Sequence, residues 1–600
     1  MSGKPALILL GIHARPAAQV LMAAFPNWDV YAPDEAALPH SLPLGSATET
    51  IAALFRDGRP VIGLCAAGIL IRAVAPHLAD KQNEPPLISV AADGSAVVPL
   101  LGGHHGGNLL ARRIAAALQG VAAITTAGDL AFGLGLDEPP EGYSLANPED
   151  AKAFMAAMLR GATIRIEGHA PWLTGSQLPL DQESGTLTIA VTHLAEEGSG
   201  ERLVYHPRSL AIGVGCERGC SPLDLIRLVQ TTLDAHNLAR ESVAGVYSLD
   251  LKADERAIQE LGGWLGVPLR FFDTARLEQE TPRLANPSDA VFAEVGCHGV
   301  AEGAALAAAG RDAELIVPKV KSRRATCAIA LSPAPFDGAT QGRPRGALHI
   351  LGTGPGGSDW LTPEARIALT GASDWVGYGL YLDLWPELQG DRALHRFELG
   401  EEEKRVRFAL DLAAEGKQVA LVCSGDPGIY AMATLAFELL EAEPQQKAWQ
   451  RVEIAVIPGV SAMQAAAAKS GAPLGHDFCA ISLSDLLTPL ETILLRIKKA
   501  AEADFVIAFY NPVSQRRREP LAMAKDILLQ HRAPETPVVL ARNLGREGER
   551  ITHVSLGELD VDRVDMLTLV IVGSGASRPL ALPDGRRFVY TPRGYGTKRE

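Results

Sequence analysis

Four glycine- or proline-containing turns in the second half of the chain could hold a small molecule against the backbone. They are LGTGPGG at 351–357, CSGDPGIY at 423–430, IPGVSA at 457–462 and FYNP at 509–512. Each follows a short apolar run, and the first two also precede a helical pattern, so these two mark the carboxyl ends of strands. Open α/β sheets bind ligands at this edge, where glycine permits close approach and the next helix offers free amides.

A second candidate site is the run GGHHGGN at 102–108. It separates a strand-like run, AVVPLL, from a helix-like run, NLLARR, and amides and the helix dipole favour an anion at such a position. His104 and His105 add groups that titrate near neutral pH. The alternative is that the glycines only form the turn, and that the histidines cap it or pack against it.

Two arginine clusters lie near predicted strand ends in the same half as the four turns. Arg516, Arg517 and Arg518 follow FYNP closely, and Arg542 and Arg546 lie at and beyond the end of the apolar run VVLA. Guanidinium groups bind carboxylates through paired hydrogen bonds, so the clusters could bind an acidic substrate. The alternative is a solvated helix start, since exposed charges dominate protein surfaces.

The seven cysteines are an odd number scattered along the chain, which argues against a disulfide framework and indicates a reducing compartment. Cys216 and Cys220, with Cys297 and His298 further on, raise the alternative of a zinc site. Their C-x3-C spacing differs from the common C-x2-C pair, and buried or turn cysteines explain it better. We therefore predict no metal.

The elements that must position these residues alternate between strand-like and helix-like runs, which predicts an α/β protein with several domains. A chain of 600 residues is too long for one core. Runs such as ATIRIEG and TLTIAV in the middle are typical of exposed strands. We expect domains at 1–135 and 208–331, a connector at 136–207, a proline- and glycine-rich linker at 332–345, and a last domain at 346–600.

The net charge of −14 disfavours a protein that coats nucleic acid. No apolar run reaches the length of a membrane span, and the first apolar run is too short for a signal peptide. We therefore expect a cytoplasmic protein with a small-molecule substrate, and neither a nucleic-acid nor a membrane partner.

The motifs of the second half, taken together, resemble those of the tetrapyrrole methyltransferases of cobalamin synthesis. Six motifs occur here in that family's order: GTGPGG, VGYGLYLD, CSGDPGIYAMA, VIPGVSAMQAAAA, FYNP and ARN. Residues 346 to about 580 are similar to the precorrin-3B C-17 methyltransferases. The resemblance implies two subdomains with the active site in the cleft between them. It also implies S-adenosylmethionine as methyl donor, a polycarboxylate tetrapyrrole as acceptor, and a homodimer.

By motif matching, the resemblance assigns residues to the donor and acceptor sites. The donor site would be lined by Pro355, Gly425, Asp426, Ala431, Met432, Ser461, Ala462, Tyr510, Asn511 and Ala541. Arg516, Arg517 and Arg542 would meet acceptor carboxylates. Asp426 could stabilise the cationic donor or accept a hydrogen bond from it; its alternative role is to cap a helix that starts near Ile429.

The first half resembles the cobalt-precorrin-5A hydrolases. Three segments are similar to the N-terminal domain of that family: CAAGILIRAVAPHL, VVPLLGGHHGGN and AITTAGD. Three later segments are similar to its C-terminal domain: AIGVGCERGCSP, VAEGAALAAAG and LIVPKVKSRRATCAIAL. The resemblance implies opening of a lactone with loss of a two-carbon fragment. That reaction needs a general base and oxyanion donors, which His104 or His105 and the glycine amides could supply.

Two other functions stay open from the sequence. The first half could bind labile tetrapyrroles without catalysis. Alternatively, the methyltransferase fold could act on RNA or on a protein side chain, although the acidic net charge argues against RNA.

Overall fold

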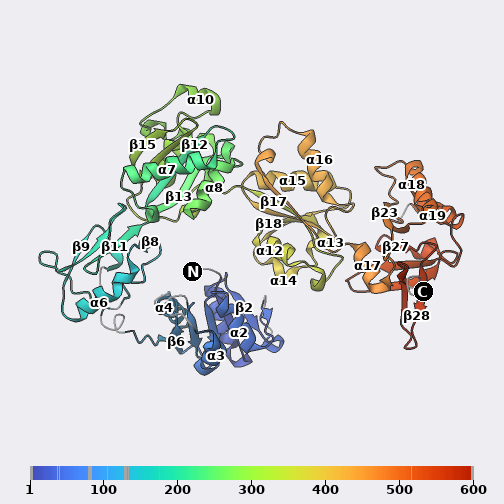
Figure 1. Ribbon diagram of the computed structural model, residues 1–600, viewed down its shortest axis with the longest axis horizontal. Helices are drawn as coiled ribbons and strands as arrows, with labels where there is room; N and C mark the ends of the chain where they lie inside the picture. The colour runs from blue at the N-terminus through green and yellow to red at the C-terminus, as the bar shows by residue number, and fades with distance from the viewer. Residues whose placement is uncertain are drawn as a thin grey trace. The chain divides into compact units, whose positions relative to one another are not determined.

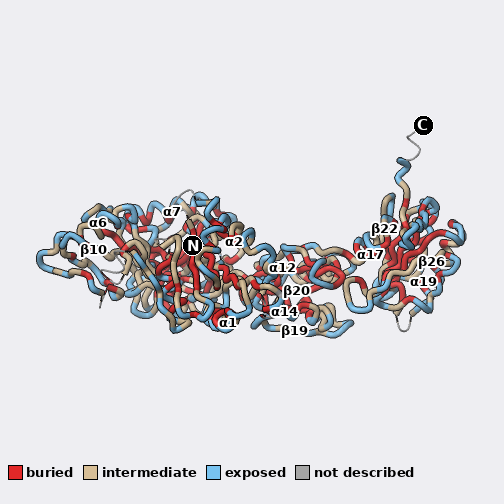
Figure 2. Tube along the Cα trace, turned by 90° about the horizontal axis from the view of Figure 1, so that it is seen from below, coloured by how far each residue is buried: buried red, intermediate tan, exposed pale blue. Residues whose placement is uncertain are grey.

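The computed structural model describes residues 4–36, 38, 41–78, 84–103, 106–126, 132, 134–173, 176–514 and 517–595. The chain divides into two compact units, residues 1–344 and 345–600. The described strands form six sheets, which Figure 1 colours in chain order from blue to red. The predicted class, several α/β domains, is confirmed. In Figure 2 the buried residues gather within the bodies that these sheets and helices form.

The first sheet of the N-terminal unit has the strand order β3-β2-β1-β4-β5-β6-β7. Neighbouring strands are parallel except for β5 and β6. The strands are β1 (Ala6–Leu9), β2 (Asp29–Ala32), β3 (Leu42–Pro43), β4 (Val61–Leu64), β5 (Leu87–Val90), β6 (Ala96–Leu101) and β7 (Val121–Ala122). The α-helices that accompany them are α1 (Arg15–Ala24), α2 (Ala47–Arg56), α3 (Ala67–Val74) and α4 (Gly107–Leu118). The short apolar strands β1, β4 and β5 are buried along their whole length, as parallel strands covered on both faces are.

The segment 136–207, expected as a connector, contains a four-stranded sheet in the order β8-β11-β10-β9. Its elements are β8 (Tyr143–Leu145), α6 (Ala151–Leu159), β9 (Ile164–Glu167), β10 (Leu187–Val191) and β11 (Arg202–Pro207). The prediction of an exposed strand is wrong for β10. This strand lies inside the sheet, where Leu187 and Ile189 share a core with Phe154 and Met158 of α6.

The third sheet has the order β14-β13-β12-β16-β15. Its strands are β12 (Leu210–Cys216), β13 (Val243–Leu249), β14 (Leu269–Phe272), β15 (Glu314–Lys321) and β16 (Ala325–Leu331). Its α-helices are α7 (Pro222–Ala235), α8 (Arg256–Leu265), α9 (Thr274–Glu278), α10 (Asp289–Val295) and α11 (Val300–Ala309). The last part of the expected linker pairs with this sheet, because Arg343 and Phe271 exchange backbone hydrogen bonds of 2.8 and 2.9 Å.

The C-terminal unit begins with a parallel sheet in the order β19-β18-β20-β17-β21. Its strands are β17 (Ala347–Gly352), β18 (Asp374–Tyr378), β19 (Ala393–Phe397), β20 (Gln418–Cys423) and β21 (Glu453–Ile457). Its α-helices are α12 (Pro363–Gly371), α13 (Gly379–Leu382), α14 (Pro386–Gln389), α15 (Glu402–Ala414) and α16 (Met432–Ala442). Thr362 caps α12 by accepting the amide of Ala365, and Pro363 is the first residue of the helix. We call this part the first subdomain.

The second subdomain holds a mixed sheet in the order β23-β24-β27-β25-β26 and a small sheet in the order β22-β29-β28. The strands are β22 (Gly471–Ala472), β23 (Phe478–Ser482), β24 (Val506–Tyr510), β25 (Pro537–Arg542), β26 (Arg550–Ser555), β27 (Thr568–Val572), β28 (Arg578–Ala581) and β29 (Arg587–Tyr590). The α-helices are α17 (Ala462–Ser470), α18 (Leu490–Glu502) and α19 (Glu519–Leu529). Among the described residues, no helix combines the length and apolarity that a membrane crossing requires.

Three turns of the C-terminal unit meet through glycine backbone, at the carboxyl ends of β17, β20 and β21. A Cβ added at Gly352 would lie 2.3 Å from the carbonyl oxygen of Gly425, and one at Gly459 would lie 2.1 Å from the same oxygen. The turns are also bonded to each other, since Gly354 and Gly425 exchange backbone hydrogen bonds of 3.2 and 2.7 Å. Only glycine permits so close an approach of backbone to backbone. The contact fixes the positions of the three turns at the edge of the sheet where α/β proteins bind ligands.

We predict that Gly459→Ala opens this junction. The added methyl group would overlap the Gly425 carbonyl, and overpacking of this kind costs about 1–3 kcal/mol. In hydrogen-exchange mass spectrometry, peptides covering 352–357 and 423–430 should exchange at least about fivefold faster than in the unmodified chain. Gly371→Ala is the matched control, because an added Cβ there meets no atom within 4 Å. Equal exchange in both variants would contradict the prediction.

Candidate functional site

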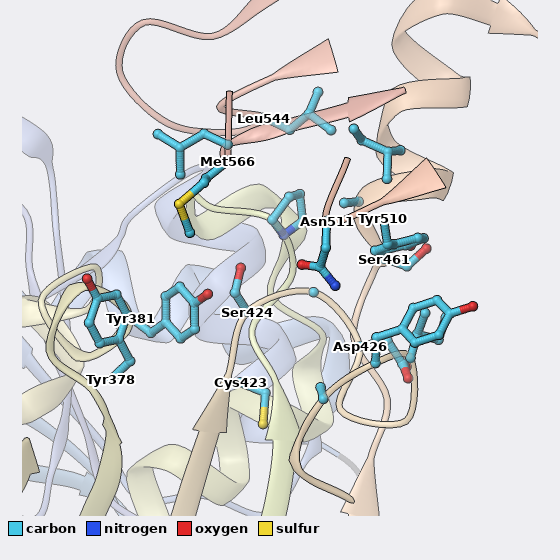
Figure 3. Close-up of a pocket in the computed structure, with 18 of the residues that line it drawn as sticks. Tyr378, Tyr381, Cys423, Ser424, Asp426, Ser461, Tyr510, Asn511, Leu544 and Met566 are labelled. Atoms are coloured by element: carbon cyan, nitrogen blue, oxygen red, sulfur yellow. The ribbon is translucent and has the colours of Figure 1, made fainter. Parts of the chain in front are cut away.

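A cavity of about 370 Å³ lies between the two subdomains of the C-terminal unit. Its size is within the range of small-molecule sites, roughly 300–1,000 Å³. Residues at the carboxyl ends of β17, β18, β20, β24 and β25 line it, together with the start of β27. In the view of Figure 3, Tyr378 and Tyr381 stand on one side, Ser461 and Tyr510 on the other, and Ser424 between them. The predicted cleft between subdomains is present.

The structure brings all ten residues of the expected donor site to this cavity. They are Pro355, Gly425, Asp426, Ala431, Met432, Ser461, Ala462, Tyr510, Asn511 and Ala541. They come from five separate stretches of chain, and the sheets bring these stretches together because the strands of an α/β fold end at a common edge.

Asp426 joins two of the glycine turns. Its Oδ1 accepts the amide of Gly428 at 2.8 Å, and its Oδ2 accepts the amide of Gly459 at 3.2 Å. The alternative role, a helix cap near Ile429, is wrong, because α16 begins only at Met432 with Ala431 as its N-cap residue. Asp426 therefore holds the turns after β20 and β21 in register.

Ser461 and Tyr510 lie on the side of the cavity opposite Tyr378 and Tyr381, and both bind the amino-terminal end of α17. Ser461 caps α17 in a capping box: its Oγ accepts the amide of Gln464, whose side chain accepts the amide of Ser461. The hydroxyl of Tyr510 accepts the amide of Met463 at 3.3 Å. Two of the orphan amides at the start of α17 are thus satisfied by residues of the cavity wall.

Strained backbone is concentrated at this cavity. Of six described non-glycine residues with positive φ, three line it: Tyr430 at 51°, Asn511 at 48° and Asn543 at 52°. Asparagine tolerates this conformation, but a bulky tyrosine rarely adopts it. The hydroxyl of Tyr430 donates to the carbonyl of Ala480 at 3.0 Å, which ties this turn of the first subdomain to the second. Such strain is typical of ligand sites.

The uncharged polar groups of the cavity stay protonated at neutral pH. Burial raises the pKa of Cys423 to about 11. Burial also raises the pKa of Tyr381 and of Tyr510. The Cys423 thiol and the Tyr381 and Tyr510 phenols are therefore neutral, and the charges of the cavity come from Glu402, Asp426 and two arginines.

Of those two arginines, Arg546 belongs to a cluster that the sequence already suggested for an acidic substrate, whereas Arg405 was not singled out from the sequence. Arg546 donates from Nε to the carbonyl of Pro355 and from its terminal nitrogen to Oγ of Ser424, both at 2.8 Å, and so bridges the subdomains. Its position among the cluster after VVLA was a usable signal. Arg405 lies within α15 in the charged run EEEKRVRF, where no sequence feature distinguishes it from its exposed neighbours.

Of the three arginines expected to bind acceptor carboxylates, Arg517 and Arg542 do not line the described cavity. Arg516 lies outside the described residues. Arg517 contacts Asp485 at 2.5 Å, and Arg542 contacts Asp565 at 2.6 Å from its Nε. Ala541 and Asn543, on either side of Arg542, do line the cavity. The acceptor role of these arginines stays a prediction.

The turn at 102–108 has the geometry of a glycine loop before a helix. His104 and His105 lie outside the described residues. Around them, Gly102 and Gly106 have φ of 66° and 87°, and the amide of Gly107 donates to the carbonyl of Gly102 at 3.0 Å. The glycines are thus needed for the turn at the start of α4, whatever the histidines do.

The cysteines of the third sheet are protonated thiols in the described structure. Burial raises the pKa of Cys216 to about 12 and also raises that of Cys297. His298 contacts Glu278 at 2.9 Å through Nδ1 and stacks on Phe292. Within the part of the chain that the structure describes, no three His, Cys, Asp or Glu side chains gather in a way that could hold a metal ion.

Three family models match the chain. The model for Tetrapyrrole (Corrin/Porphyrin) Methylases matches residues 347–560. The model for the Cobalamin synthesis G N-terminal region matches residues 49–129, and the model for the Cobalamin synthesis G C-terminus matches residues 210–330. The first of these covers the strands and turns that build the cavity except for the start of β27, and the other two lie in the N-terminal unit.

Individual relatives match the C-terminal unit. A precorrin-3B C(17)-methyltransferase from Sinorhizobium sp is 45% identical over 250 residues, which are 42% of this chain and 97% of that protein. A probable cobalt-factor III C(17)-methyltransferase from Salmonella typhimurium is 44% identical, over 41% of this chain and 99% of that protein. The solved structure of the methyltransferase CobJ is 42% identical, covers 41% of this chain and all of that one, and has a TM-score of 0.38.

The resemblance inferred from the motifs is therefore confirmed for both halves of the chain. Identity above 40% extends over nearly the whole length of those two C(17)-methyltransferases. The chain belongs to the tetrapyrrole methylase family through its C-terminal unit, and parts of its N-terminal unit match the two cobalamin synthesis G models.

Proposed function

We propose that this chain methylates C-17 of precorrin-3B or cobalt-factor III and contracts the ring, as a step of cobalamin biosynthesis. S-adenosylmethionine is the proposed donor. The observation that carries the proposal is the meeting of all ten expected donor-site residues in one cavity between the subdomains. The names of the two C(17)-methyltransferase relatives, one for precorrin-3B and one for cobalt-factor III, support these two candidate substrates.

The residues of the cavity fit a nucleoside with a sulfonium centre. Small apolar side chains such as Ala431, Ala462 and Ala541 alternate with the hydroxyl and amide groups of Ser461, Tyr510 and Asn511. When bound, S-adenosylmethionine would supply an electrophilic methyl group. The protein would then contribute orientation and exclusion of water, because methyl transfer needs an aligned carbon nucleophile and no covalent help.

The direct test is anaerobic incubation of the purified chain with the donor and either metal-free precorrin-3B or cobalt-factor III. Mass analysis should show the gain of one methyl group on one of the two substrates and a ring-contracted product. Reactions without donor are the control. Methylation of neither tetrapyrrole would overturn the proposal, and methylation of an RNA or peptide instead would favour the non-tetrapyrrole alternative.

Charge reversal at Arg542 tests the expected acceptor site. Arg542→Glu places a carboxylate beside Asp565 and next to two cavity residues, so it should repel an acidic acceptor. We expect the acceptor KM to rise about tenfold or more and the donor KM to stay within about twofold. Arg563→Glu, at an exposed arginine paired with Asp560, is the control. An equal rise in both KM values would rule out a role specific to the acceptor.

A second activity, opening of a lactone on the contracted macrocycle with release of a two-carbon fragment, is proposed for the N-terminal unit. Two matched cobalamin synthesis G domains and the glycine turn before α4 support it. Amides of that turn could stabilise an oxyanion, and His104 or His105 could act as the base. The alternative remains a unit that binds tetrapyrroles without catalysis.

We expect the double variant His104→Ala, His105→Ala to lose release of the two-carbon fragment while C-17 methylation stays unchanged. A general base contributes roughly 10²–10⁴-fold, so the loss should exceed about 100-fold. His13→Ala, at an exposed histidine of the same domain, is the control. Release at the normal rate from the double variant would exclude both histidines, and no release from the unmodified chain would favour the non-catalytic alternative.

We further propose, from the resemblance alone, that the chain is a homodimer and acts in the cytoplasm. Light scattering should then give twice the chain mass of 63.5 kDa.

A further inference from the structure

Arg405 carries a charge in the cavity that the proposed donor site does not use. Arg405 projects from α15, lines the cavity, and is only 3% exposed. An arginine stays ionised in proteins, and burying an isolated charge is costly unless it is paired. Arg405 should therefore have an anionic partner.

The described residues provide no carboxylate that contacts Arg405 as an ion pair, although its charge helps to lower the pKa of Glu401. One terminal nitrogen of Arg405 donates to the carbonyl of Glu398 at 2.9 Å, the other lies 4.0 Å from the sulfur of Met432, and Nε has no acceptor. No described carboxylate lies within 4.0 Å of its guanidinium, as an ion pair would require. Arg407, two residues along the same helix, contrasts with it, since Glu403 and Glu443 both contact its guanidinium.

Arg546 brings a second guanidinium to the same cavity from the second subdomain. Its partners are a carbonyl and a hydroxyl, and among the described residues no carboxylate pairs with it. It lies over the ring of Tyr381, 5.5 Å from the centroid. Although burial raises the pKa of Tyr381, both Arg546 and Arg405 oppose that rise, so both positive charges act on the Tyr381 hydroxyl.

The carboxylates of the cavity do not neutralise these arginines. Asp426 accepts the amides of Gly428 and Gly459, and Glu402 accepts the amide of Gly400 at 3.1 Å. Neither forms an ion pair with Arg405 or Arg546. The two arginines, which both act on the Tyr381 hydroxyl, thus lack an ion-paired carboxylate among the described residues.

We propose that Arg405 and Arg546 form a carboxylate-binding subsite, an inference that rests on the proposed methyltransferase function. Paired hydrogen bonds to a carboxylate would satisfy the donors of Arg405 that lack acceptors. The carboxylate can come from the tetrapyrrole acceptor or from the amino-acid part of the methyl donor. Because the arginines belong to different subdomains, the bound carboxylate would also hold the subdomains together.

The test compares Arg405→Met with Arg407→Met in the full chain. Binding of S-adenosylhomocysteine, which has the carboxylate, and of 5′-methylthioadenosine, which lacks it, is measured by calorimetry, and the acceptor KM by methylation kinetics. Loss of a hydrogen bond to a charged group should weaken binding about 10- to 100-fold. Circular dichroism checks folding, and Arg546→Met serves as a second variant if Arg405→Met does not fold.

The outcomes separate the two sources of the carboxylate. Weaker binding of S-adenosylhomocysteine with unchanged binding of 5′-methylthioadenosine assigns the subsite to the donor. A raised acceptor KM with unchanged binding of both nucleosides assigns it to the acceptor. The subsite proposal would be overturned if the folded Arg405→Met and Arg546→Met variants bind both nucleosides normally and keep the acceptor KM. It would also be overturned if Arg407→Met has the same effect as Arg405→Met. Failure of the unmodified chain to methylate either tetrapyrrole would instead overturn the proposed function.

Discussion

The contact between three glycine turns is the constraint on which the candidate site depends. Gly352, Gly425 and Gly459 bring the ends of β17, β20 and β21 so close that no side chain fits between them. Asp426 adds hydrogen bonds across the same junction. Since backbone rather than side chains forms this contact, the positions of Pro355, Ala431 and Ser461 around the cavity follow from it.

The second subdomain completes the cavity through few but specific contacts with the first. Arg546 bonds to Pro355 and Ser424, and Tyr430 reaches Ala480. The left-handed conformations of Tyr430 and Asn511 orient the chain at these contacts. Strain of about 1–3 kcal/mol at such residues persists only where surrounding structure holds it. The junction of glycine turns and the bridging hydrogen bonds provide that support.

Charge pairing differs between the arginines of the cavity and two arginines near it. Arg407 and Arg542 have carboxylate partners, whereas the two arginines of the cavity have none among the described residues. An acidic chain with a net charge of −14 thus keeps two arginines without ion pairs where an acidic ligand would bind. Local arrangement therefore matters more for such a ligand than the net charge does.

The sequence by itself determined the α/β class, the glycine turns and the ten residues expected at the donor site, because strand ends and turn glycines are local features that motifs preserve. The sequence assigned Asp426 to the donor site but left a helix cap as its alternative, which is wrong, and it placed β10 wrongly as an exposed strand. Both depend on distant neighbours: the amide of Gly459 and the core around Phe154. Only the tertiary structure decided that Arg405 is buried and lacks a carboxylate partner while Arg407 is paired, since burial and charge pairing are set by residues far away in the chain.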